Sequence, residues 1–506
     1  YPRFQGGCIW DWNDKAILLS TPDGAPYFAY GGDFGPDFDY QRFYQDNEDP
    51  QMCCNGIVGP DLTPHPGAYE VKKVQAPLSL TAMYPGDILK GQLILRNKYL
   101  ALSLSHLSID WELLEDGQPI QNGSLSAVDL PAGQKTSITI PFTRPESLTP
   151  GAEYHLNIHF TLREATSWAQ AGHEVYWEQF QVPFPVPESP RRKIEAMPDL
   201  VLSESLDSLT IHNPAFSITF SKSLGTITSY RAHQVEMIHT GPLENYYRAP
   251  TDVDLLMGNP PASIHRWREA GLDRLERCVV RFTFARVNPK EVEIRVASRI
   301  AAEGKPDGIY SQVIYRVLGS GEVVIENDVQ ISERLPHLPR VGLEIQMPAG
   351  FEYLNWYGRG PHENYADRKK GAAVGRYTSS VDEQFTPYVY PSESGGKEDV
   401  RWLALTDRTG AGLLVMGATP FHMDALHYTI ADLEHARHPY ALTRRDETIL
   451  HLDCRHMGVG GDDGWMAPVH PEFLVQPGSY HFALRLAPLT ASCDPSSLAR
   501  DKIEGV

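Results

Sequence analysis

The stretch Tyr154-His155-Leu156-Asn157-Ile158-His159-Phe160-Thr161-Leu162 alternates apolar and polar side chains over most of its length. Because successive side chains of an extended chain point to opposite faces, this period of two predicts a β-strand with one buried face. The same alternation recurs from Ile109 to Leu113, and the Asp116-Gly117 pair that follows predicts a turn. Such strands, with turns about every ten residues, are typical of an antiparallel β-sandwich, which we expect over residues 79–188.

The strand pattern is then interrupted by four prolines and a short basic run, at Pro183, Pro185, Pro187, Pro190 and Arg191-Arg192-Lys193. Proline cannot donate a hydrogen bond to the interior of a sheet, and it favours a stiff extended chain. We therefore expect a linker at residues 189–194, with a domain boundary there.

Alternation resumes beyond the linker, as from Phe216 to Phe220, and continues to about residue 490. Helical spacing of apolar residues occurs in two short places, one around Trp267 and one around Leu433, the second with Thr429 as its N-cap. The pattern predicts one large β-sandwich over residues 195–490 and a tail at 491–506.

The first 78 residues differ from the rest. Ile9-Trp10-Asp11-Trp12 predicts a short apolar strand, and a loop-like region follows to about residue 62. Between Asp33 and Gln51 this region carries six acids against one arginine, with five aromatic residues interleaved. A long polar loop containing aromatics is either the rim of a binding cleft or a surface insertion.

Composition excludes several classes of function. Of the 506 residues, 42% are hydrophobic and 22% charged, which indicates folded domains rather than disorder. The formal net charge of −19, without a basic stripe, argues against nucleic acid or an anionic membrane as a partner. No stretch approaches the ~20 apolar residues of a membrane span. Since the chain opens at Tyr1 without a leader, we interpret it as part of a longer protein or a processed product.

The six cysteines are scattered without the spacing of a zinc site or a disulfide scaffold, and two of them are adjacent, Cys53-Cys54. This usage predicts buried free thiols in a reducing compartment. We therefore expect a cytoplasmic protein.

The familiar catalytic signatures, such as a Gly-x-Ser-x-Gly elbow, a P-loop or a His-Glu-x-x-His pair, are missing from the sequence. In Gly6–Trp12 a tryptophan either offers its flat face to a sugar ring or fills a core. In Arg455–Trp465 the glycines would hold Trp465 at a loop tip. His456, Asp462 and Asp463 there could ligate a metal, although Asp in glycine-rich turns more often hydrogen-bonds the backbone. The residues alone indicate a β-rich protein with a carbohydrate-binding surface.

Tyr1-Pro2-Arg3-Phe4-Gln5-Gly6-Gly7 through Trp10-Asp11-Trp12 resembles a late barrel strand of bacterial β-galactosidases of the lactose-operon type, in glycoside hydrolase family 2. Further segments agree with that family in the same order and cover nearly the whole chain. They are Tyr30-Gly31-Gly32-Asp33-Phe34-Gly35, Asn55-Gly56-Ile57-Val58, Thr63-Pro64-His65-Pro66, Arg248-Ala249-Pro250-Thr251-Asp252, Tyr357-Gly358-Arg359-Gly360-Pro361-His362-Glu363-Asn364-Tyr365, Pro387-Tyr388-Val389-Tyr390-Pro391 and His456–Trp465.

The resemblance implies a mainly β fold with three parts. Residues 1–78 would be the C-terminal part of a (β/α)8 TIM barrel, and residues 79–188 an immunoglobulin-like β-sandwich. After the linker at 189–194, residues 195–490 would form the large C-terminal β-supersandwich of the family.

The resemblance also implies retaining hydrolysis of terminal β-D-galactosides such as lactose. In the family the two catalytic glutamates and the Mg²⁺ ligands precede the segment that begins here at Tyr1. We therefore expect no catalytic residue in this chain and no activity from it alone. Its partners would be the β-galactoside substrate and the N-terminal part of the same enzyme, or a complementary barrel-bearing subunit. The full form would be a homo-oligomer, with neither nucleic acid nor membrane as partner.

The resemblance assigns a few site residues. Trp10 matches the tryptophan that packs along the galactose ring, and Trp465 matches the one that forms the aglycone platform. Asn55 matches a Na⁺ ligand. Met52 stands where the family has a phenylalanine whose backbone carbonyl also binds Na⁺, and the nearby loop at residues 35–51 is longer than the family pattern.

A mobile loop at the site entrance matches the segment that contains Arg248, Asp252 and Asp254, with Val253 in place of the usual asparagine. Trp10 and Trp465 leave a second hypothesis open. The chain would then be a non-catalytic, carbohydrate-binding or structural β-sandwich subunit of a larger complex.

Overall fold

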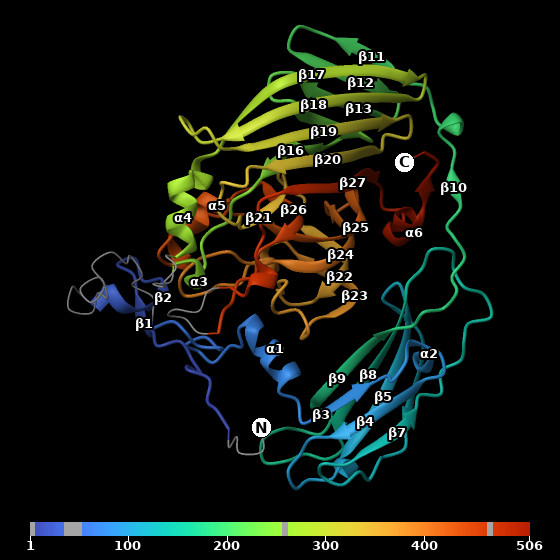
Figure 1. Cartoon of the computed structure of the whole chain (residues 1–506), viewed down its shortest axis with the longest axis vertical. Helices are drawn as coiled ribbons and strands as arrows, with labels where there is room; N and C mark the ends of the chain where they lie inside the picture. Colours follow the sequence, from blue (N-terminus) through green and yellow to red (C-terminus); the bar gives the residue numbers. More distant parts are fainter. Residues whose placement is uncertain (1–5, 35–52, 256–261, 463–468, 506) are drawn as a thin grey trace. The chain divides into compact units, whose positions relative to one another are not determined.

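The computed structural model describes residues 6–34, 53–255, 262–462 and 469–505. The chain divides into two compact units, each built mainly from β-strands (Figure 1). One comprises Tyr1–Ala68, Lys193–Lys369 and Thr378–Pro495, and the other comprises Tyr69–Arg192, Lys370–Tyr377 and Ser496–Val506. The prediction of a mainly β fold is confirmed.

The smaller unit contains a β-sandwich of two antiparallel sheets. One sheet has the order β3-β4-β7 and the other the order β6-β5-β8-β9. The strands are β3 (Leu78–Thr81), β4 (Gln92–Asn97), β5 (Leu107–Glu115), β6 (Gln118–Leu125), β7 (Lys135–Thr139), β8 (Tyr154–Leu162) and β9 (Glu174–Gln181).

Strand β8 coincides with the alternating stretch that predicted it. Its residues Leu156, Ile158 and Phe160 are fully buried in the core between the sheets. Asp116 and Gly117 connect β5 to β6 with φ of 46° and 79°, the backbone of a tight hairpin turn that glycine adopts without steric cost. The remaining elements at or near this unit are α1 (Pro66–Val74), α2 (Pro85–Ile88), η4 (Leu104–His106), β10 (Arg191–Arg192), α6 (Pro495–Arg500) and β28 (Lys502–Ile503).

The larger unit is organised around one long antiparallel sheet with the order β16-β21-β26-β25-β27-β20-β19-β18-β17, to which β24 adds beside β25 and β22 beside β24. The strands are β16 (Thr240–Asn245), β17 (Glu276–Asn288), β18 (Glu291–Ala301), β19 (Ile309–Leu318), β20 (Val323–Ile331), β21 (Arg340–Met347), β22 (Tyr353–Gly360), β24 (Lys397–Thr406), β25 (Gly412–Leu426), β26 (Thr448–His456) and β27 (Ser479–Leu489). Strand β23 (Ala373–Ser380) is divided between the two units. A second sheet comprises β11 (Val201–Glu204), β12 (Ser208–Asn213), β13 (Phe216–Ser221), β14 (Thr226–Ala232) and β15 (Val235–Ile238). Both sheets bury apolar faces, as in β13, where Phe216, Ile218 and Phe220 are buried.

Both predicted helices are present. Helix α4 (Ser263–Ala270) buries Trp267 and ends at Gly271, whose φ of 81° stops the helix. At α5 (Ile430–His435), the Thr429 hydroxyl accepts from the Asp432 amide at 3.2 Å and the Asp432 carboxylate accepts from the Thr429 amide at 2.8 Å. This reciprocal pair is a capping box and fixes the start of the helix. The short helical elements are α3 (Asp252–Leu255), η1 (Gly31–Phe34), η5 (Ile194–Ala196), η6 (Leu272–Arg274), η7 (Asp382–Gln384), η8 (Pro439–Ala441) and η9 (Pro471–Phe473).

The predicted strand at Ile9–Trp12 is wrong. This segment is irregular, with bends at Trp10 and Trp12, whose side chains are 75% and 63% exposed. Its backbone lies along residues 55–58, where the Asp11 amide donates to the Asn55 carbonyl at 3.2 Å and Asn13 forms an isolated parallel bridge to Val58. The pairing ends at that one bridge and does not continue to the next residues, so no regular strand forms. The strands described in this region are β1 (Ile17–Ser20) and β2 (Pro26–Ala29), which form an antiparallel hairpin.

All six cysteines are free, as predicted, but none is fully buried. Cys8, Cys278 and Cys493 are exposed, and Cys53, Cys54 and Cys454 are partly exposed. Cys278 illustrates the physical reason, because it lies on β17 at the end of the long sheet, where neighbouring side chains such as Val280 also face solvent. Among the described residues, no helix has both the length and the apolar character that a membrane crossing requires.

Candidate functional site

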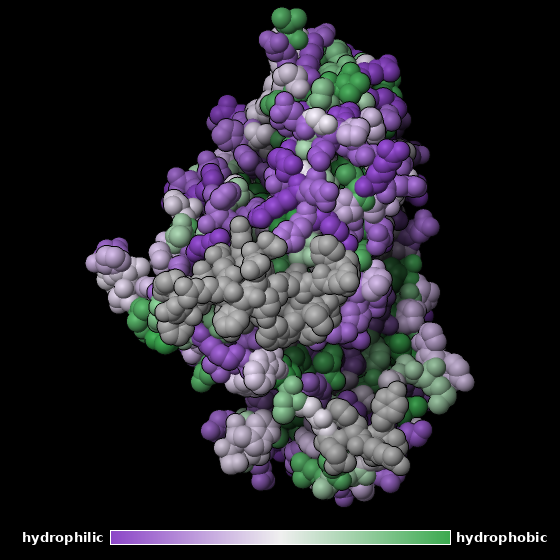
Figure 2. All heavy atoms as spheres, turned by 60° about the vertical axis from the view of Figure 1, so that its left-hand side comes forward, coloured by the Kyte–Doolittle hydropathy of each residue, from purple (hydrophilic) through white to green (hydrophobic). Residues whose placement is uncertain are grey.

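Trp10 presents its indole at the surface beside two charged side chains. Lys15 forms an ion pair with Asp11, and its ammonium lies 5.8 Å from the centroid of the Trp10 ring. The exposed indole therefore combines a flat apolar ring with an ammonium over it and a carboxylate beside that ammonium, groups that suit the C–H face and the hydroxyl groups of a sugar. Figure 2 shows the face that contains the left-hand side of Figure 1, with apolar residues scattered among hydrophilic ones.

Asn55, the predicted Na⁺ ligand, lies beside Trp10 through the pairing of residues 11–13 with 55–58. Its side-chain Oδ1 accepts a hydrogen bond from Lys15 Nζ at 3.1 Å, so this oxygen already faces a cation. A neutral amide oxygen of this kind suits Na⁺, which would have to take the place of the ammonium. Met52 and the 35–51 insertion lie outside the described residues.

Behind this surface, Asp14 is a buried carboxylate that fixes the backbone next to Asn55. It accepts from the Gly56 amide at 2.7 Å, and His65 Nε2 lies 3.5 Å away. Burial raises the pKa of Asp14 to about 7, although the hydrogen bond from Gly56 opposes the shift. A Cβ at Gly56 would lie 2.2 Å from the Asp14 nitrogen, so only glycine fits there.

The N-terminal segment docks on residues 437–440 of the same unit. Asp33 accepts from the Tyr30 amide at 2.9 Å and lies 3.1 Å from His438 Nε2. The Tyr30 hydroxyl donates to the Arg437 carbonyl at 2.6 Å. His438 in turn stacks on Tyr440, which is 51% exposed and lies edge-on to Tyr27. The structure thus brings an aromatic patch, Tyr27 with Tyr440, to the surface near Asp33.

The predicted entrance segment contains two fully buried residues. The Arg248 guanidinium binds the Asp254 carboxylate at 2.8–3.1 Å and donates to the carbonyls of Met457 and Gly458 at 3.0 and 3.1 Å. Arg248 and Asp254 therefore anchor the start of the glycine-rich loop rather than face a ligand at the surface. Asp252 is the exposed member of the three, at the start of α3.

Asp367 fixes the backbone of the glycine-rich loop, because its Oδ2 accepts from the amides of Val459 and Gly460 at 2.9 and 2.8 Å. Asp462 is exposed and pairs with His470 at 2.8 Å, whereas His456 is buried. Two of the three residues considered as metal ligands, His456 and Asp462, therefore have separate surroundings. Asp463 and Trp465 lie outside the described residues.

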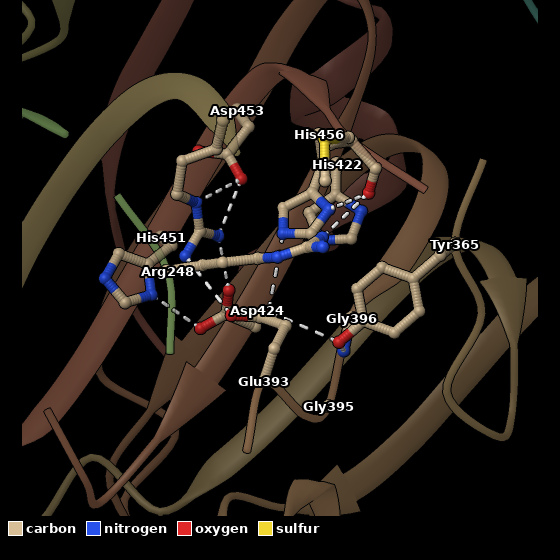
Figure 3. Close-up of polar contacts among 12 residues, drawn as sticks. Arg248, Tyr365, Glu393, Gly395, Gly396, His422, Asp424, His451, Asp453 and His456 are labelled. Carbon is tan, nitrogen blue, oxygen red and sulfur yellow. Dashed lines mark hydrogen bonds and ion pairs between the residues drawn. The ribbon is translucent and has the colours of Figure 1, made fainter. Parts of the chain in front are cut away.

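A buried network of charges lies where β21, β25 and β26 run side by side (Figure 3). Arg340 binds Asp453 at 2.6 Å and Asp424 at 2.7 Å, and His451 Nδ1 lies 2.7 Å from Asp424. Burial opposes the charge on His451 and Asp424, but their attraction prevails. The attraction to Asp424 raises the pKa of His451 to about 10, and the attraction to His451 and Arg340 lowers the pKa of Asp424. Both residues are therefore charged at neutral pH.

Sequence reasoning missed the members of this network, which include Glu393 and His422. Burial raises the pKa of Glu393 to about 7, and burial lowers that of His456 well below its usual value. The signal available was the period of two itself. His422 and Asp424 occupy alternate positions of one apolar strand, and His451 and Asp453 do so on its neighbour, so polar residues occur where the pattern expects a buried face.

Three sequence families match consecutive parts of the chain. The family described as "Glycosyl hydrolases family 2, TIM barrel domain" matches residues 1–80, "Beta-galactosidase, domain 4" matches residues 93–183, and "Beta galactosidase small chain" matches residues 212–486. The last of these spans more than half of the chain.

Curated relatives named β-galactosidase align with nearly the whole chain. The identity is 35% over 495 residues with the protein of Priestia megaterium, 36% over 496 residues with that of Vibrio cholerae and 33% over 502 residues with that of Photobacterium profundum. The alignments cover 96–97% of this chain and 45–46% of each relative. The chain therefore spans a little under half the length of the relatives it matches.

Proposed function

This chain belongs to the β-galactosidases of glycosyl hydrolase family 2, and we propose that it is the C-terminal portion of an enzyme that hydrolyses terminal β-D-galactosides such as lactose. The observation that carries the proposal is the collinear match to proteins named β-galactosidase along 96–97% of the chain. The order of the three matched families along the chain, from the barrel domain to the small chain, supports the same assignment.

In this proposal the chain supplies substrate contacts and the rest of the enzyme supplies the catalytic acid and nucleophile. A (β/α)8 barrel takes about 250 residues, and its active site is built from loops of all eight repeats. The barrel family matches 80 residues here, and their described part contains the β1–β2 hairpin, η1, α1 and the first residues of β3. The two glutamates of a retaining glycosidase, about 5 Å apart, would therefore lie on barrel strands outside this chain, together with the Mg²⁺ ligands.

The residues described here would act at the sugar. Trp10 would pack along the apolar face of the galactose ring, which its exposure allows. Asn55 would give one oxygen to a Na⁺ ion, and the buried Asp14 would hold the backbone of residues 55 and 56 in place. When bound, the ion would attract the oxygen of a sugar hydroxyl. Trp465 would form the aglycone platform at the end of the loop that Arg248 and Asp367 anchor.

The test is turnover of a chromogenic β-galactoside. We expect none from the purified chain and turnover once it is mixed with the polypeptide that precedes it in the full-length enzyme. A Trp10→Ala chain should reconstitute with a higher KM, and a Trp168→Ala chain, altered at another exposed tryptophan, should reconstitute like the parent. Turnover by the chain alone at an enzymatic rate would refute the proposed division of labour.

A second candidate is carbohydrate binding without catalysis, and the exposure of Trp10 and Tyr440 favours it. Galactose would then quench the tryptophan fluorescence of the isolated chain, and the quenching would be lost in Trp10→Ala. Reconstituted turnover would distinguish the enzyme from this alternative. We further propose that the complete enzyme is cytoplasmic, which the six free cysteines of this chain suit. We also propose that it is a homo-oligomer, which light scattering of the complete enzyme would test.

A further inference from the structure

Three buried side chains in the larger unit converge as metal ligands would. Glu393 precedes β24, His422 lies on β25 and His456 ends β26, and one ligand atom from each falls within 4.8 Å of the others. All three side chains are at most 4% exposed. We call this group the His2Glu cluster; Figure 3 shows its members facing one another.

The hydrogen bonds behind the two histidines determine which nitrogen is available. His422 Nδ1 donates to Glu398 Oε1 at 3.0 Å, and His456 Nδ1 donates to the Met457 carbonyl at 2.8 Å. The Met457 carbonyl and an ionised Glu398 can only accept hydrogen bonds, so Nδ1 of each ring must carry the proton. A neutral ring in this orientation presents a bare Nε2 lone pair. In zinc sites, a hydrogen-bond acceptor on the other ring nitrogen likewise orients each metal-binding histidine.

The Nε2 atoms of both histidines are buried and have no hydrogen-bond partner. His456 Nε2 lies 3.5 Å from Glu393 Oε1, and when Glu393 is ionised two electron-pair donors face each other there without a hydrogen between them. Such a pair is unfavourable unless a cation lies between the atoms. Ligand atoms of a tetrahedral zinc ion, bound at about 2.0–2.1 Å, are themselves about 3.3 Å apart.

The nearby positive charges are already matched, so they do not exclude a cation. Arg340 is bound by Asp424 and Asp453, and Arg248 is bound by Asp254. Arg340 Nη1 lies 3.8 Å from Glu393 Oε2 and makes no hydrogen bond there. Neither arginine donates a hydrogen bond to the Glu393 carboxylate, which can therefore bind a metal ion.

One movement is required. The rings of His422 and His456 are stacked with centroids 4.4 Å apart and 21° between their planes, and Tyr365 lies against both. A metal lies in the plane of each imidazole that binds it, so the two rings must turn out of the stack. Zinc binding requires a turn that keeps both Nδ1 atoms near their acceptors and brings the Nε2 atoms toward Glu393.

We propose that Glu393, His422 and His456 bind one zinc ion in the interior of the larger unit. Two imidazoles and one carboxylate are a ligand set that zinc accepts, with the fourth position left for water or the Tyr365 hydroxyl, which lies 3.3 Å from Glu393 Oε1. This site shares no residue with the Na⁺ and Mg²⁺ sites of the proposed function and does not depend on it.

The experiment uses the full chain, dialysed against a chelator and then loaded with zinc or cobalt. We expect one zinc per chain by elemental analysis and the visible absorption of four-coordinate cobalt. His456→Gln and Glu393→Gln should each lose the bound ion, whereas His337→Gln, which alters a buried histidine bonded to Ser263, should keep it. Removing the acceptor behind His422, by Glu398→Ala, should weaken binding about 10- to 100-fold.

Circular dichroism checks that each variant is folded. If the glutamine variants do not fold, His422→Cys provides a second test. A thiolate is also a zinc ligand, so this variant should retain the ion and add a sulfur-to-cobalt charge-transfer band. Failure of the folded parent chain to retain zinc would overturn the proposal. So would undiminished binding by folded His456→Gln, or cobalt bound by His422→Cys without the new band.

Discussion

Replacing Asp254 by asparagine should destabilise the larger unit strongly, because it leaves a buried charge without a partner. Arg248 and Asp254 are 0% and 1% exposed, and three guanidinium–carboxylate hydrogen bonds of 2.8–3.1 Å join them. Asparagine has nearly the same shape, so the change removes charge and little packing. Breaking one partner of a buried pair costs about 3–5 kcal/mol, and we expect a loss in that range from Asp254→Asn.

The matched control is Asp273→Asn. Asp273 pairs with Arg274 at 2.8 Å, but the side chains are 26% and 55% exposed, and such surface pairs contribute about 0–1 kcal/mol. In the double variant Arg248→Met/Asp254→Leu both charges are gone, so it should be more stable than Asp254→Asn alone.

Urea unfolding followed by circular dichroism gives the free energies. Hydrogen exchange of residues 456–462 reports locally, because Arg248 holds the carbonyls of Met457 and Gly458. We expect faster exchange there in Asp254→Asn than in the parent chain. If Asp254→Asn and Asp273→Asn cost the same within about 1 kcal/mol, the pair is not the anchor inferred here.

Four smaller predictions follow from single side chains. Leu156→Ala should cost about 2–5 kcal/mol in urea unfolding of the sandwich, whereas Leu100→Ala, fully exposed, should cost almost nothing; equal losses would contradict the assigned core. Burial lowers the pKa of Lys397 to about 8, so below pH 8 the charge of this side chain opposes folding. Lys397→Met should therefore raise the free energy of unfolding by about 3 kcal/mol at pH 7. This gain should fade as the pH rises from 8 to 10.5, which urea unfolding across that range would check. Thr429→Ala removes the capping hydroxyl of α5 and should cost about 1 kcal/mol, seen as faster hydrogen exchange confined to that helix. Trp10→Ala should change the unfolding free energy by less than about 0.5 kcal/mol, and a larger loss would show that the ring is part of a core.

Local patterns were sufficient for the regular elements. The period of two over residues 154–162 predicted β8 with its bounds, and the spacing around Leu433 with Thr429 as cap predicted α5. Both are properties of neighbouring residues: an alternating strand buries one face whatever covers it, and a capping hydroxyl reaches an amide three residues away. The motifs of residues 1–66 and 248–465 likewise identified the family before any contact was known.

The partners of those elements were decided only in the folded chain. Ile9–Trp12 has the composition of a strand, but the pairing beside it is limited to an isolated bridge from Asn13 to Val58. Arg248 and Asp254 looked like surface residues of an entrance loop, yet each is buried because the other neutralises it. His422 and His456 lie on strands β25 and β26 and Glu393 on the segment before β24, and no spacing along the chain relates them. Burial of a charged or polar side chain depends on which distant residue faces it, and strand pairing over long separations determines that.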